Sequence, residues 1–251
     1  HNPLPYNGIK LLLEDGMAPD IEKAALIKKA FLENKTTTVD SVSCGTVSQN
    51  LDTNDIHIQK VLELINIEAV REKKFKVVLD SVNGAGGPAG KKLLERLGCE
   101  VTAINDEPTG LFAHTPEPIK ENLSQLCQKV KEVGADVGFA QDPDADRLAI
   151  VSETGHYPGE EYTLALAADY VLSKRPGIAA ANLSTSRMID DVAARYGSKV
   201  IRTAVGEANV ARAMIQNNCL IGGEGNGGVI DLRVGPVRDS IYAMAVILAL
   251  M

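Results

Sequence analysis

The chain has 251 residues, of which 45% are hydrophobic, so it is long enough for one large core or two ordinary ones. Its 33 acidic and 26 basic residues give a formal net charge of -7, which argues against a nucleic-acid-binding surface. No apolar stretch reaches the roughly 18 to 20 residues that a membrane-spanning helix needs, so we expect no membrane span.

The four cysteines, Cys44, Cys99, Cys127 and Cys219, are widely separated and show no paired spacing. The sequence therefore contains no recognisable zinc motif or disulfide framework. Free cysteines are typical of a reducing compartment, so the sequence predicts a cytoplasmic protein.

Apolar strands alternate with amphipathic helices along most of the chain, which is the pattern of parallel α/β units. Residues 1–44 are interpreted as the remnant of one domain with its linker, and they contain a predicted strand at 9–13 and a helix at 20–33. A domain over residues 45–153 contains predicted strands at 76–80, 100–104, 135–140 and 148–151 and helices at 88–97 and 123–133. A domain over residues 154–251 contains predicted helices at 160–172, 186–196 and 207–217, strands at 178–182, 199–202 and 219–222, and a terminal helix from residue 243.

The predicted fold class is α/β, with two similar lobes of mixed or parallel sheet preceded by the remnant of a third. The chain opens on His1 without an initiator methionine and ends inside a predicted helix. Neither end resembles a natural domain boundary, so we expect the chain to be a fragment of a larger protein.

The densest cluster of charge lies between two predicted strands, where Asp142, Asp144 and Asp146 occupy alternate positions and Arg147 follows. Three unpaired carboxylates would repel one another and their pKa values would rise. A hard cation such as Mg²⁺ binds carboxylates in the ionised form, so we interpret this loop as a metal site. A solvated acidic turn is the simpler alternative.

The same spacing fits positions 1, 3 and 5 of an EF-hand calcium loop, with Glu153 at position 12. Position 6 of that loop requires glycine, whereas this chain has Arg147, and the predicted flanks are strands instead of helices. The EF-hand interpretation is therefore disfavoured. A guanidinium matches phosphate oxygens in a bidentate fork, so Arg147 indicates that a phosphate shares the site.

The glycine-rich segment 83–87 lies between a predicted strand and a predicted helix. It lacks the full spacing of a dinucleotide-binding motif and the acidic residue that would contact a ribose. The segment favours tight strand-to-helix packing, with phosphate binding as the alternative.

A second glycine-rich segment, residues 222–228, contains five glycines around one carboxylate and one amide. It follows a predicted strand, and open α/β sheets bind ligands at the carboxyl ends of their strands. We therefore predict that Gly223, Glu224, Gly225 and Asn226 contact a polyhydroxylated ligand. A turn with incidental polar residues is the alternative.

Together these residues resemble the α-D-phosphohexomutase family, which includes phosphoglucomutase, phosphomannomutase and phosphoglucosamine mutase. The family carries a phosphoserine loop of the form T-A/G-S-H-N-P-x-x-Y-N-G-x-K, a D-x-D-x-D-R metal loop and a G-E-x-S-G-H sugar loop. Residues 1–10 match the first motif from the position after the serine, residues 142–147 match the second completely, and residues 223–228 match the third in part. The resemblance covers essentially the whole chain and implies domains 2 and 3 of a four-domain protein.

The resemblance implies an enzyme that interconverts hexose 6-phosphate and hexose 1-phosphate through a phosphoserine and a bisphosphorylated sugar. Asp142, Asp144 and Asp146 would hold Mg²⁺ against the phosphoserine, and Arg147 would bind the same phosphate. A phosphorylated hexose is the expected partner, and neither a nucleic acid nor a membrane is expected.

The resemblance also assigns roles to residues outside the metal loop. Lys10 matches the family's base position and would accept a proton if desolvation and neighbouring cations lower its pKa. His1 would assist with the phosphate or the proton, and Glu224 would orient sugar hydroxyls. The nucleophilic serine and the phosphate-clamping fourth domain of the family are absent from the chain, so we expect this fragment alone to be inactive.

The departures in the sugar loop are the only evidence on the hexose. Asn226 stands where the family has serine, and Gly228 stands where it has histidine. An amide with space beside it accommodates a 2-amino group, and this form of the loop is similar to archaeal-type phosphoglucosamine mutases. Glucosamine phosphate is therefore the preferred substrate, with mannose or glucose phosphate as the alternatives.

Two functions of other classes remain open at this point. A catalytically incomplete module that binds sugar phosphates fits the chain as given, because the nucleophile is absent. A Mg²⁺-dependent phosphatase needs an aspartate nucleophile at the tip of its first strand, and Asp80 occupies such a position.

Overall fold

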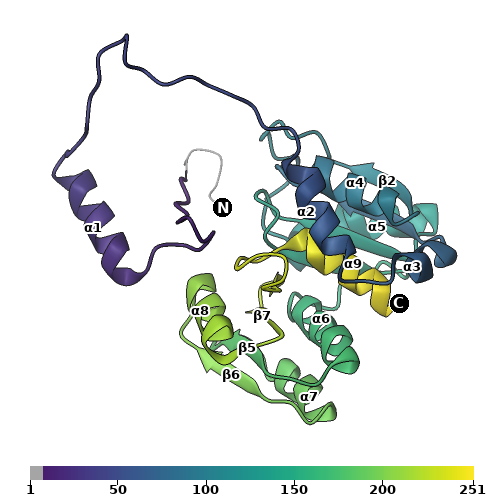
Figure 1. The fold of residues 1–251 in the computed structure, drawn as a ribbon. Coiled ribbons are helices and arrows are strands. Elements are labelled where there is room, and N and C mark those ends of the chain that lie inside the picture. Colours follow the sequence, from purple (N-terminus) through teal and green to yellow (C-terminus); the bar gives the residue numbers. More distant parts are fainter. Residues whose placement is uncertain (1–7) are drawn as a thin grey trace.

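The computed structural model describes residues 8–251, which contain two separate four-stranded sheets (Figure 1). In the first lobe the strand order is β2-β1-β3-β4, with β1 (Lys76–Asp80), β2 (Glu100–Ile104), β3 (Val137–Gln141) and β4 (Leu148–Ser152). In the second lobe the order is β6-β5-β7-β8, with β5 (Ala179–Asn182), β6 (Val200–Thr203), β7 (Ile221–Glu224) and β8 (Gly228–Ile230). The predicted pair of similar α/β lobes is therefore confirmed, and no single sheet runs through both.

The two sheets have the same pattern of strand directions. In each lobe the first strand pairs in parallel with its two neighbours, and the last strand pairs antiparallel with the third. The predicted metal loop connects β3 to β4, and the predicted sugar loop connects β7 to β8. The two loops are therefore topologically equivalent, and each lies at the carboxyl end of a parallel strand, where ligands of α/β sheets bind.

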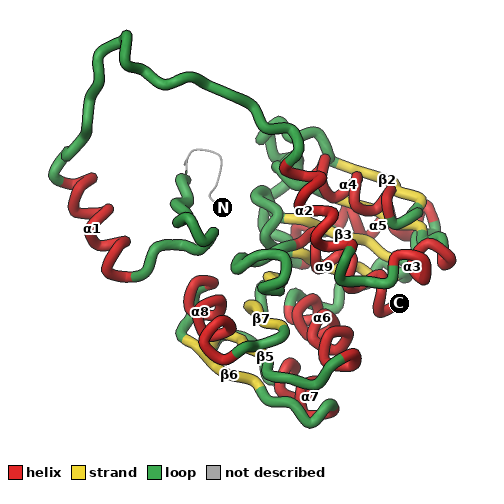
Figure 2. The backbone as a smooth tube through the Cα atoms, in the orientation of Figure 1, coloured by secondary structure: helices red, strands yellow, loops and turns green. Residues whose placement is uncertain are grey.

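Helices cover both faces of each sheet (Figure 2). The first lobe has α2 (Thr53–Leu62), α3 (Ile67–Lys73), α4 (Gly87–Arg96), the 3-10 turn η1 (Lys120–Asn122) and α5 (Ser124–Val133). The second lobe has α6 (Glu161–Lys174), α7 (Met188–Arg195) and α8 (Glu207–Asn217). Alternate strand residues serve the two faces, so Val77 and Leu79 join one cluster of buried side chains whereas Val78 joins another under α5.

The last helix, α9 (Ser240–Leu250), is apolar on nearly all sides and is buried from Ser240 to Leu248. A helix that is hydrophobic all round must be enclosed, and α9 contacts α2, α3 and α4 of the first lobe as well as α6 of the second. It joins one continuous core that contains Phe139 of the first sheet and Ile221 of the second. Among the described residues no helix is both long and apolar enough to cross a membrane.

The segment before the first lobe contains α1 (Ile21–Leu32), which lies apart from both sheets in Figure 1. Asp20 caps this helix by accepting a hydrogen bond from the backbone of Lys23. Just before it, Met17 packs against the core under α8, and Arg212 donates to the carbonyl oxygen of Ala18. These contacts place Met17 and Ala18 beside the second lobe.

Several element predictions were wrong. Residues 9–13 form no strand, because this segment pairs with neither sheet. Helices α2 and α3 and the three-residue strand β8 were missed, although Ile58, Val61 and Leu62 show the i, i+3, i+4 spacing of a buried helix face. Strand β7 begins two residues later than predicted and includes Glu224, so part of the glycine-rich segment is strand instead of loop.

Candidate functional site

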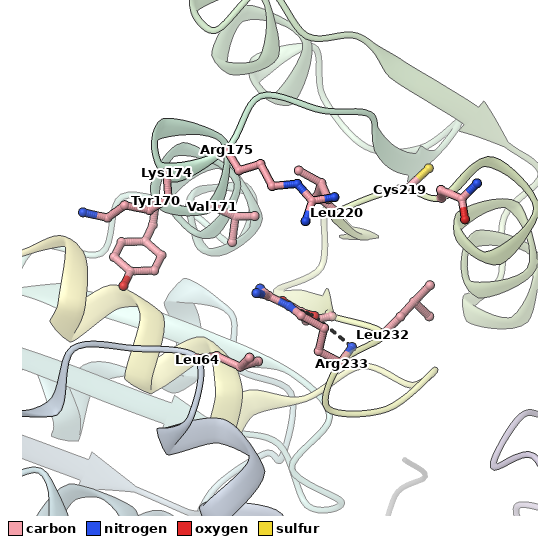
Figure 3. A pocket seen from close by; sticks show the side chains of 11 residues that line it. Leu64, Tyr170, Val171, Lys174, Arg175, Cys219, Leu220, Leu232 and Arg233 are labelled. Atoms are coloured by element: carbon pink, nitrogen blue, oxygen red, sulfur yellow. Dashed lines mark hydrogen bonds and ion pairs between the residues drawn. The ribbon is translucent and has the colours of Figure 1, made fainter.

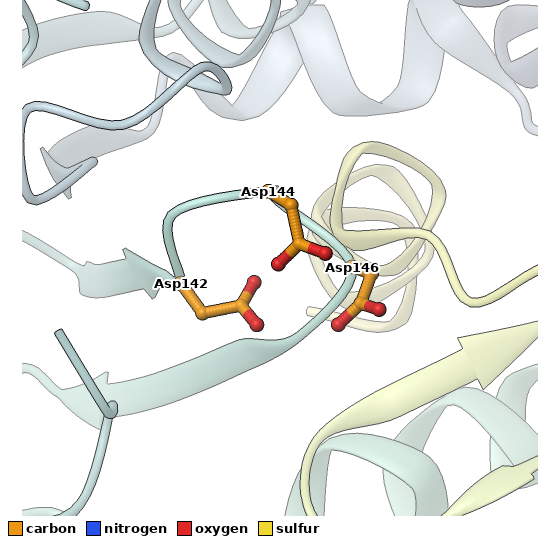
Figure 4. A group of neighbouring side chains, drawn as sticks. All are labelled: Asp142, Asp144 and Asp146. Atoms are coloured by element: carbon orange, nitrogen blue, oxygen red, sulfur yellow. The ribbon is translucent and has the colours of Figure 1, made fainter. Parts of the chain in front are cut away.

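The predicted metal loop brings its three carboxylates together (Figure 4). One oxygen of Asp142, one of Asp144 and one of Asp146 all lie within 4.8 Å of one another. Asp142 and Asp146 are buried, whereas Asp144 at the tip of the loop is exposed. Three converging carboxylate oxygens are the donor set of a hard divalent cation, so these residues fit Mg²⁺.

The charges around this loop are unevenly compensated. Burial, reinforced by the neighbouring Asp146 and Asp144, raises the pKa of Asp142 to about 8. Burial also acts to raise the pKa of Asp146, but Arg238 and Lys10 outweigh it and hold that pKa below its usual value. One oxygen of Asp146, Oδ1, is buried and has no hydrogen-bond partner within residues 8–251. An oxygen in that position is suited to a cation.

The loop is held by close backbone contacts with the glycine-rich turn after β1. The amide of Ala85 donates to the carbonyl oxygen of Pro143 at 2.8 Å. A Cβ on Gly84 would lie 2.6 Å from the backbone of Pro143, and one on Gly86 would collide with Ala145. The glycines of residues 83–87 therefore serve packing, as predicted, although the surface that they meet is the metal loop as well as the helix.

A buried chain of hydrogen bonds also fixes the loop. Ser81 donates to Gln141 Oε1 at 2.8 Å, Gln141 Nε2 donates to Ser240 Oγ at 2.8 Å, and Ser240 Oγ donates to the carbonyl oxygen of Ala145 at 2.7 Å. Ala145 has a positive φ of 58°, which is strained for a residue with a side chain. Ser240 begins α9, so the central helix holds the strained turn of the metal loop.

Arg147 lies against the carboxylates that precede it. Its amide donates to Asp142 Oδ1 at 3.0 Å, and its Nε lies 3.8 Å from Asp146 Oδ1. Its Nη1 lies 3.6 Å from the exposed Glu117. Arg147 therefore lies at the predicted site, although its guanidinium contacts carboxylates in this structure.

The EF-hand alternative is wrong. The loop is flanked by strands β3 and β4, whereas an EF-hand needs helices. Glu153, which would be the twelfth position, follows the far end of β4 and is exposed. A five-residue strand spans roughly 16 Å, so Glu153 does not reach the ion that the three aspartates would hold.

Arg238 joins the metal loop to the sugar loop, and the sequence analysis missed it. Its guanidinium donates to Asp146 Oδ2 at 2.5 Å, to Glu224 Oε2 at 2.7 Å and to Glu207 Oε2 at 2.9 Å. Its side chain is only 11% exposed. These carboxylates come from the β3–β4 loop, the end of β7 and the start of α8, so one arginine fixes three elements from both lobes.

Glu224 is held on both carboxylate oxygens. Oε1 accepts from Asn182 Nδ2 at 2.7 Å and from the amide of Gly206 at 3.2 Å, and Oε2 accepts from Arg238. A carboxylate has about four acceptor positions, so one remains for a ligand hydroxyl. Asn226 is half-buried at the tip of the hairpin, where its side-chain oxygen accepts from the amide of Gly228.

The glycines of this hairpin allow close packing within the protein. Space beside Gly223 is taken by the carbonyl oxygen of Gly228, and space beside Gly225 by the carboxylate of Glu161. The missing side chains therefore admit the protein's own atoms. A backbone hydrogen bond from Leu148 to the carbonyl oxygen of Gly227, at 3.0 Å, ties the hairpin to β4 of the first lobe.

Lys10 lies at the metal loop, as the motif match predicted, with Nζ 3.1 Å from Asp146 Oδ2 and 3.5 Å from Asp144 Oδ2. Its expected electrostatic environment is wrong. Burial acts to lower the pKa of Lys10, but Asp146 and further carboxylates outweigh it, so that pKa is raised. Carboxylates therefore dominate the surroundings of Lys10, although the cation Arg238 also binds Asp146 Oδ2. His1, the other predicted catalytic residue of this segment, lies outside the described residues.

Asp80 does not have the environment of a phosphatase nucleophile. It is 1% exposed, and its Oδ1 accepts from the amide of Val82 and from Asn105 Nδ2. Oδ2 lies 3.0 Å from His114 Nε2, while His114 Nδ1 faces the carbonyl oxygen of Thr115 at 2.9 Å. Both ring nitrogens face acceptors, which favours the protonated imidazole, and the pair anchors the loop after β2.

The functional residues that sequence reasoning missed follow strands or precede helices. Arg238 and Ser240 flank Asp239, which caps α9 by accepting from the amides of Ile241 and Tyr242. Charged residues just before a wholly apolar helix were the available signal for Arg238. No local pattern distinguishes Gln141, whose partners lie 60 and 99 residues away in the chain.

Comparisons with known proteins agree with this architecture. A family model described as "Phosphoglucomutase/phosphomannomutase, alpha/beta/alpha domain II" matches residues 55–155, and the corresponding model of domain III matches residues 159–251. A Thermococcus kodakarensis protein named "Phosphoglucomutase/phosphomannomutase" is 41% identical over 92% of this chain and 51% of its own length. A Methanosarcina barkeri protein named "Probable phosphoglucosamine mutase" is 37% identical over 98% of this chain and 55% of its own length.

Among solved structures, a phosphoglucomutase/phosphomannomutase family protein from Burkholderia thailandensis superimposes with a TM-score of 0.84 at 28% identity. The match covers 100% of this chain and 53% of that structure. The chain thus spans about half the length of the curated relatives and the solved structure that it matches.

We predict that Asp144→Asn weakens Mg²⁺ binding at least tenfold, because it removes one of three ionised oxygen donors. Asp144 is exposed, so the change should leave the fold intact. Isothermal titration calorimetry measures the affinity. Glu153→Gln is the matched control: it should bind Mg²⁺ as the unchanged chain does, whereas equal losses in both variants would support an EF-hand-like site.

We predict that Arg238→Met lowers the free energy of unfolding by about 3–5 kcal/mol, because it leaves buried carboxylates without their cation. Urea denaturation measures the loss. The control Arg195→Met breaks an exposed pair with Asp169 and should cost about 1 kcal/mol or less. Equal losses in the two variants would show that Arg238 does not stabilise the joint between the lobes.

The Asp80–His114 pair should make stability depend on pH. The hydrogen bond that His114 donates to Asp80 outweighs burial and raises the pKa of His114 in the folded state. The stabilisation is therefore fully present below the unfolded pKa of about 6.5 and is lost as pH rises through the folded pKa. His114→Asn should cost more at pH 5.5 than at pH 9 in urea denaturation, and this difference should vanish in the Asp80→Asn background.

Proposed function

This chain belongs to the phosphoglucomutase/phosphomannomutase family, and from that premise we propose that the protein is a phosphohexomutase, an intramolecular phosphotransferase that interconverts hexose 6-phosphate and hexose 1-phosphate. The observation that carries the proposal is the junction at Arg238, where the predicted metal loop and the predicted sugar loop meet. Such a reaction needs a phosphate site and a hydroxyl site within reach of each other.

In the proposed reaction a phosphoserine donates its phosphoryl group to the sugar, and the second phosphate of the bisphosphorylated intermediate returns to the serine. Asp142, Asp144 and Asp146 would hold Mg²⁺, which when bound neutralises charge on the phosphoryl oxygens. The phosphate of the phosphoserine displaces the carboxylates that contact Arg147, and Arg147 then binds this phosphate in a bidentate manner. Glu224 accepts a hydrogen bond from a sugar hydroxyl on its remaining acceptor position.

Lys10 acts in this proposal as a cation. Its pKa is raised beside Asp146 and Asp144, so the ammonium form predominates and suits it to stabilise the phosphoryl group in transfer. A proton-accepting role needs the neutral amine, which these neighbours disfavour. The position of Lys10 at the metal loop supports the electrostatic role.

We predict that Lys10→Met in the full-length protein lowers kcat by about 10²- to 10³-fold, with a smaller change in KM, because the charge acts in the transition state. Lys10→Arg keeps the charge and should retain at least about a tenth of the activity. Steady-state kinetics of both variants distinguish the electrostatic role from the proton-accepting role. If Lys10→Arg loses as much activity as Lys10→Met, Lys10 acts as the base. Lys29→Met, on the exposed surface of α1, is the control.

We propose glucosamine phosphate as the substrate. Asn226 supplies an amide at the tip of the sugar hairpin, and the Methanosarcina barkeri relative carries the name phosphoglucosamine mutase. The expected preference is about 1 kcal/mol, the scale of one net hydrogen bond. The Thermococcus kodakarensis relative, named phosphoglucomutase/phosphomannomutase, makes the neutral hexoses the competing substrates.

The substrate proposal predicts that kcat/KM of the full-length protein is highest on glucosamine 6-phosphate, compared with glucose 6-phosphate and mannose 6-phosphate. Asn226→Ser should reduce that preference without lowering the rates on the neutral sugars. A tenfold preference for a neutral sugar would overturn the substrate assignment but not the mutase activity. Binding of all three sugars without turnover would instead support a binding module.

A further inference from the structure

A second pocket lies at the end of the second lobe that is remote from the metal and sugar loops. It has a volume of about 310 Å³ and is lined by the end of α6, the segment before β7 and the segment after β8. The sugar hairpin lies at the opposite end of β7 and β8, because those strands run antiparallel between the two places. The pocket is therefore distinct from the proposed catalytic site.

Cations dominate the rim of this pocket. Lys174 and Arg175 come from the end of α6, and Arg233 comes from the segment after β8. Asp231 is the only acidic residue in the lining, so three positive charges against one leave an excess of two. The chain as a whole carries a net charge of -7, so this pocket has the opposite sign from the molecule.

The guanidinium groups of Arg233 and Arg175 differ in how far contacts within the protein already occupy them. Arg233 is oriented by Asp231, to which its Nε donates at 2.9 Å and its Nη2 at 2.6 Å. Arg175 is exposed, and its side chain makes no hydrogen bond or ion pair within residues 8–251. Figure 3 shows both groups projecting from opposite walls toward the same space.

Apolar side chains form the remaining walls. Val171, Leu220 and Leu232 line the pocket on the second lobe, and Leu64 reaches it from the first lobe. Tyr170 contributes its ring, over which Lys174 Nζ lies 5.4 Å from the centroid. A bare inorganic anion would leave these apolar walls uncovered, whereas a ligand with a planar apolar part would bury them.

We propose that this pocket binds a phosphorylated small molecule that has a planar apolar part, of the kind and size of a nucleoside monophosphate. Arg175 and Arg233 hold the phosphate in a bidentate manner, and the planar part packs against the aliphatic walls. The volume lies at the lower end of the range of small-molecule sites, about 300 to 1,000 Å³, which fits a ligand of this size. The inference stands apart from the proposed mutase activity.

Bound ligand would also bridge the two lobes. Leu64 belongs to the turn between α2 and α3, whereas Arg175 and Arg233 belong to the second lobe. Asp231, which orients Arg233, also accepts a hydrogen bond from Tyr242 of α9 at 2.6 Å. A ligand that binds only the folded arrangement therefore raises the melting temperature of both lobes together.

The test is calorimetric titration of the full-length protein with AMP, UMP, adenosine and pyrophosphate. We expect AMP or UMP to bind with a dissociation constant below about 1 mM, and adenosine and pyrophosphate to bind at least tenfold more weakly. Arg175→Ala should weaken nucleotide binding at least fivefold, because it removes a charged donor without leaving a buried carboxylate unpaired. Asp144→Asn should leave nucleotide binding unchanged, because it alters only the metal loop.

Four results would overturn the proposal. The absence of binding by both nucleotides would show that the pocket takes no ligand of this class. An affinity that is unchanged in Arg175→Ala, or that falls equally in Asp144→Asn, would place the nucleotide elsewhere. Pyrophosphate binding as tight as that of AMP would show a simple anion site in which the apolar walls have no role.

Discussion

The burial of α9 is the constraint on which the arrangement of the two lobes depends. Eleven residues from Ser240 to Leu250 have almost no polar face, and an isolated second lobe would leave much of that surface in water. The helices of the first lobe cover it, so the two sheets share one core although they share no strand. This packing sets the relative position of the metal loop and the sugar loop. Helix α9 comes after the sugar hairpin in the chain, and its first residue lies beside the metal loop.

Electrostatic contacts at the head of α9 convert this packing into a specific site. Ser240 holds the strained backbone of Ala145, and Arg238 binds Asp146 and Glu224 two residues before the helix begins. Apolar packing alone tolerates shifts of side chains at small cost. A buried guanidinium between carboxylates does not tolerate such shifts, because a displaced carboxylate would remain charged and unpaired. The shared core therefore brings the lobes together, and Arg238 fixes the register between their functional loops.

Much of the fold could be predicted from the sequence because its strands are continuous apolar segments and its main helices are amphipathic. The boundaries of β1, β2 and α8 agree with the predictions, whereas the expected strand at residues 9–13 was wrong because that segment pairs with no strand among the described residues. The metal loop could be predicted from the sequence because its three aspartates and Arg147 lie close together in the chain. The sequence could not predict the roles of Arg238, Gln141 and Ser240. Their partners are distant in sequence and become neighbours only through the packing of α9.

The pKa of Lys10 illustrates a further limit of sequence reasoning. Its position in a motif indicated that it lies at the metal loop, but the sign of its environment depends on which charges the fold places around it. Asp146 offers Oδ2 to both Lys10 and Arg238, while its buried Oδ1 faces none of these cations. A metal ion that binds Oδ1 would leave the Oδ2 contacts in place. Under the proposed function, cation binding at Oδ1 would then coexist on one carboxylate with the joint between the lobes.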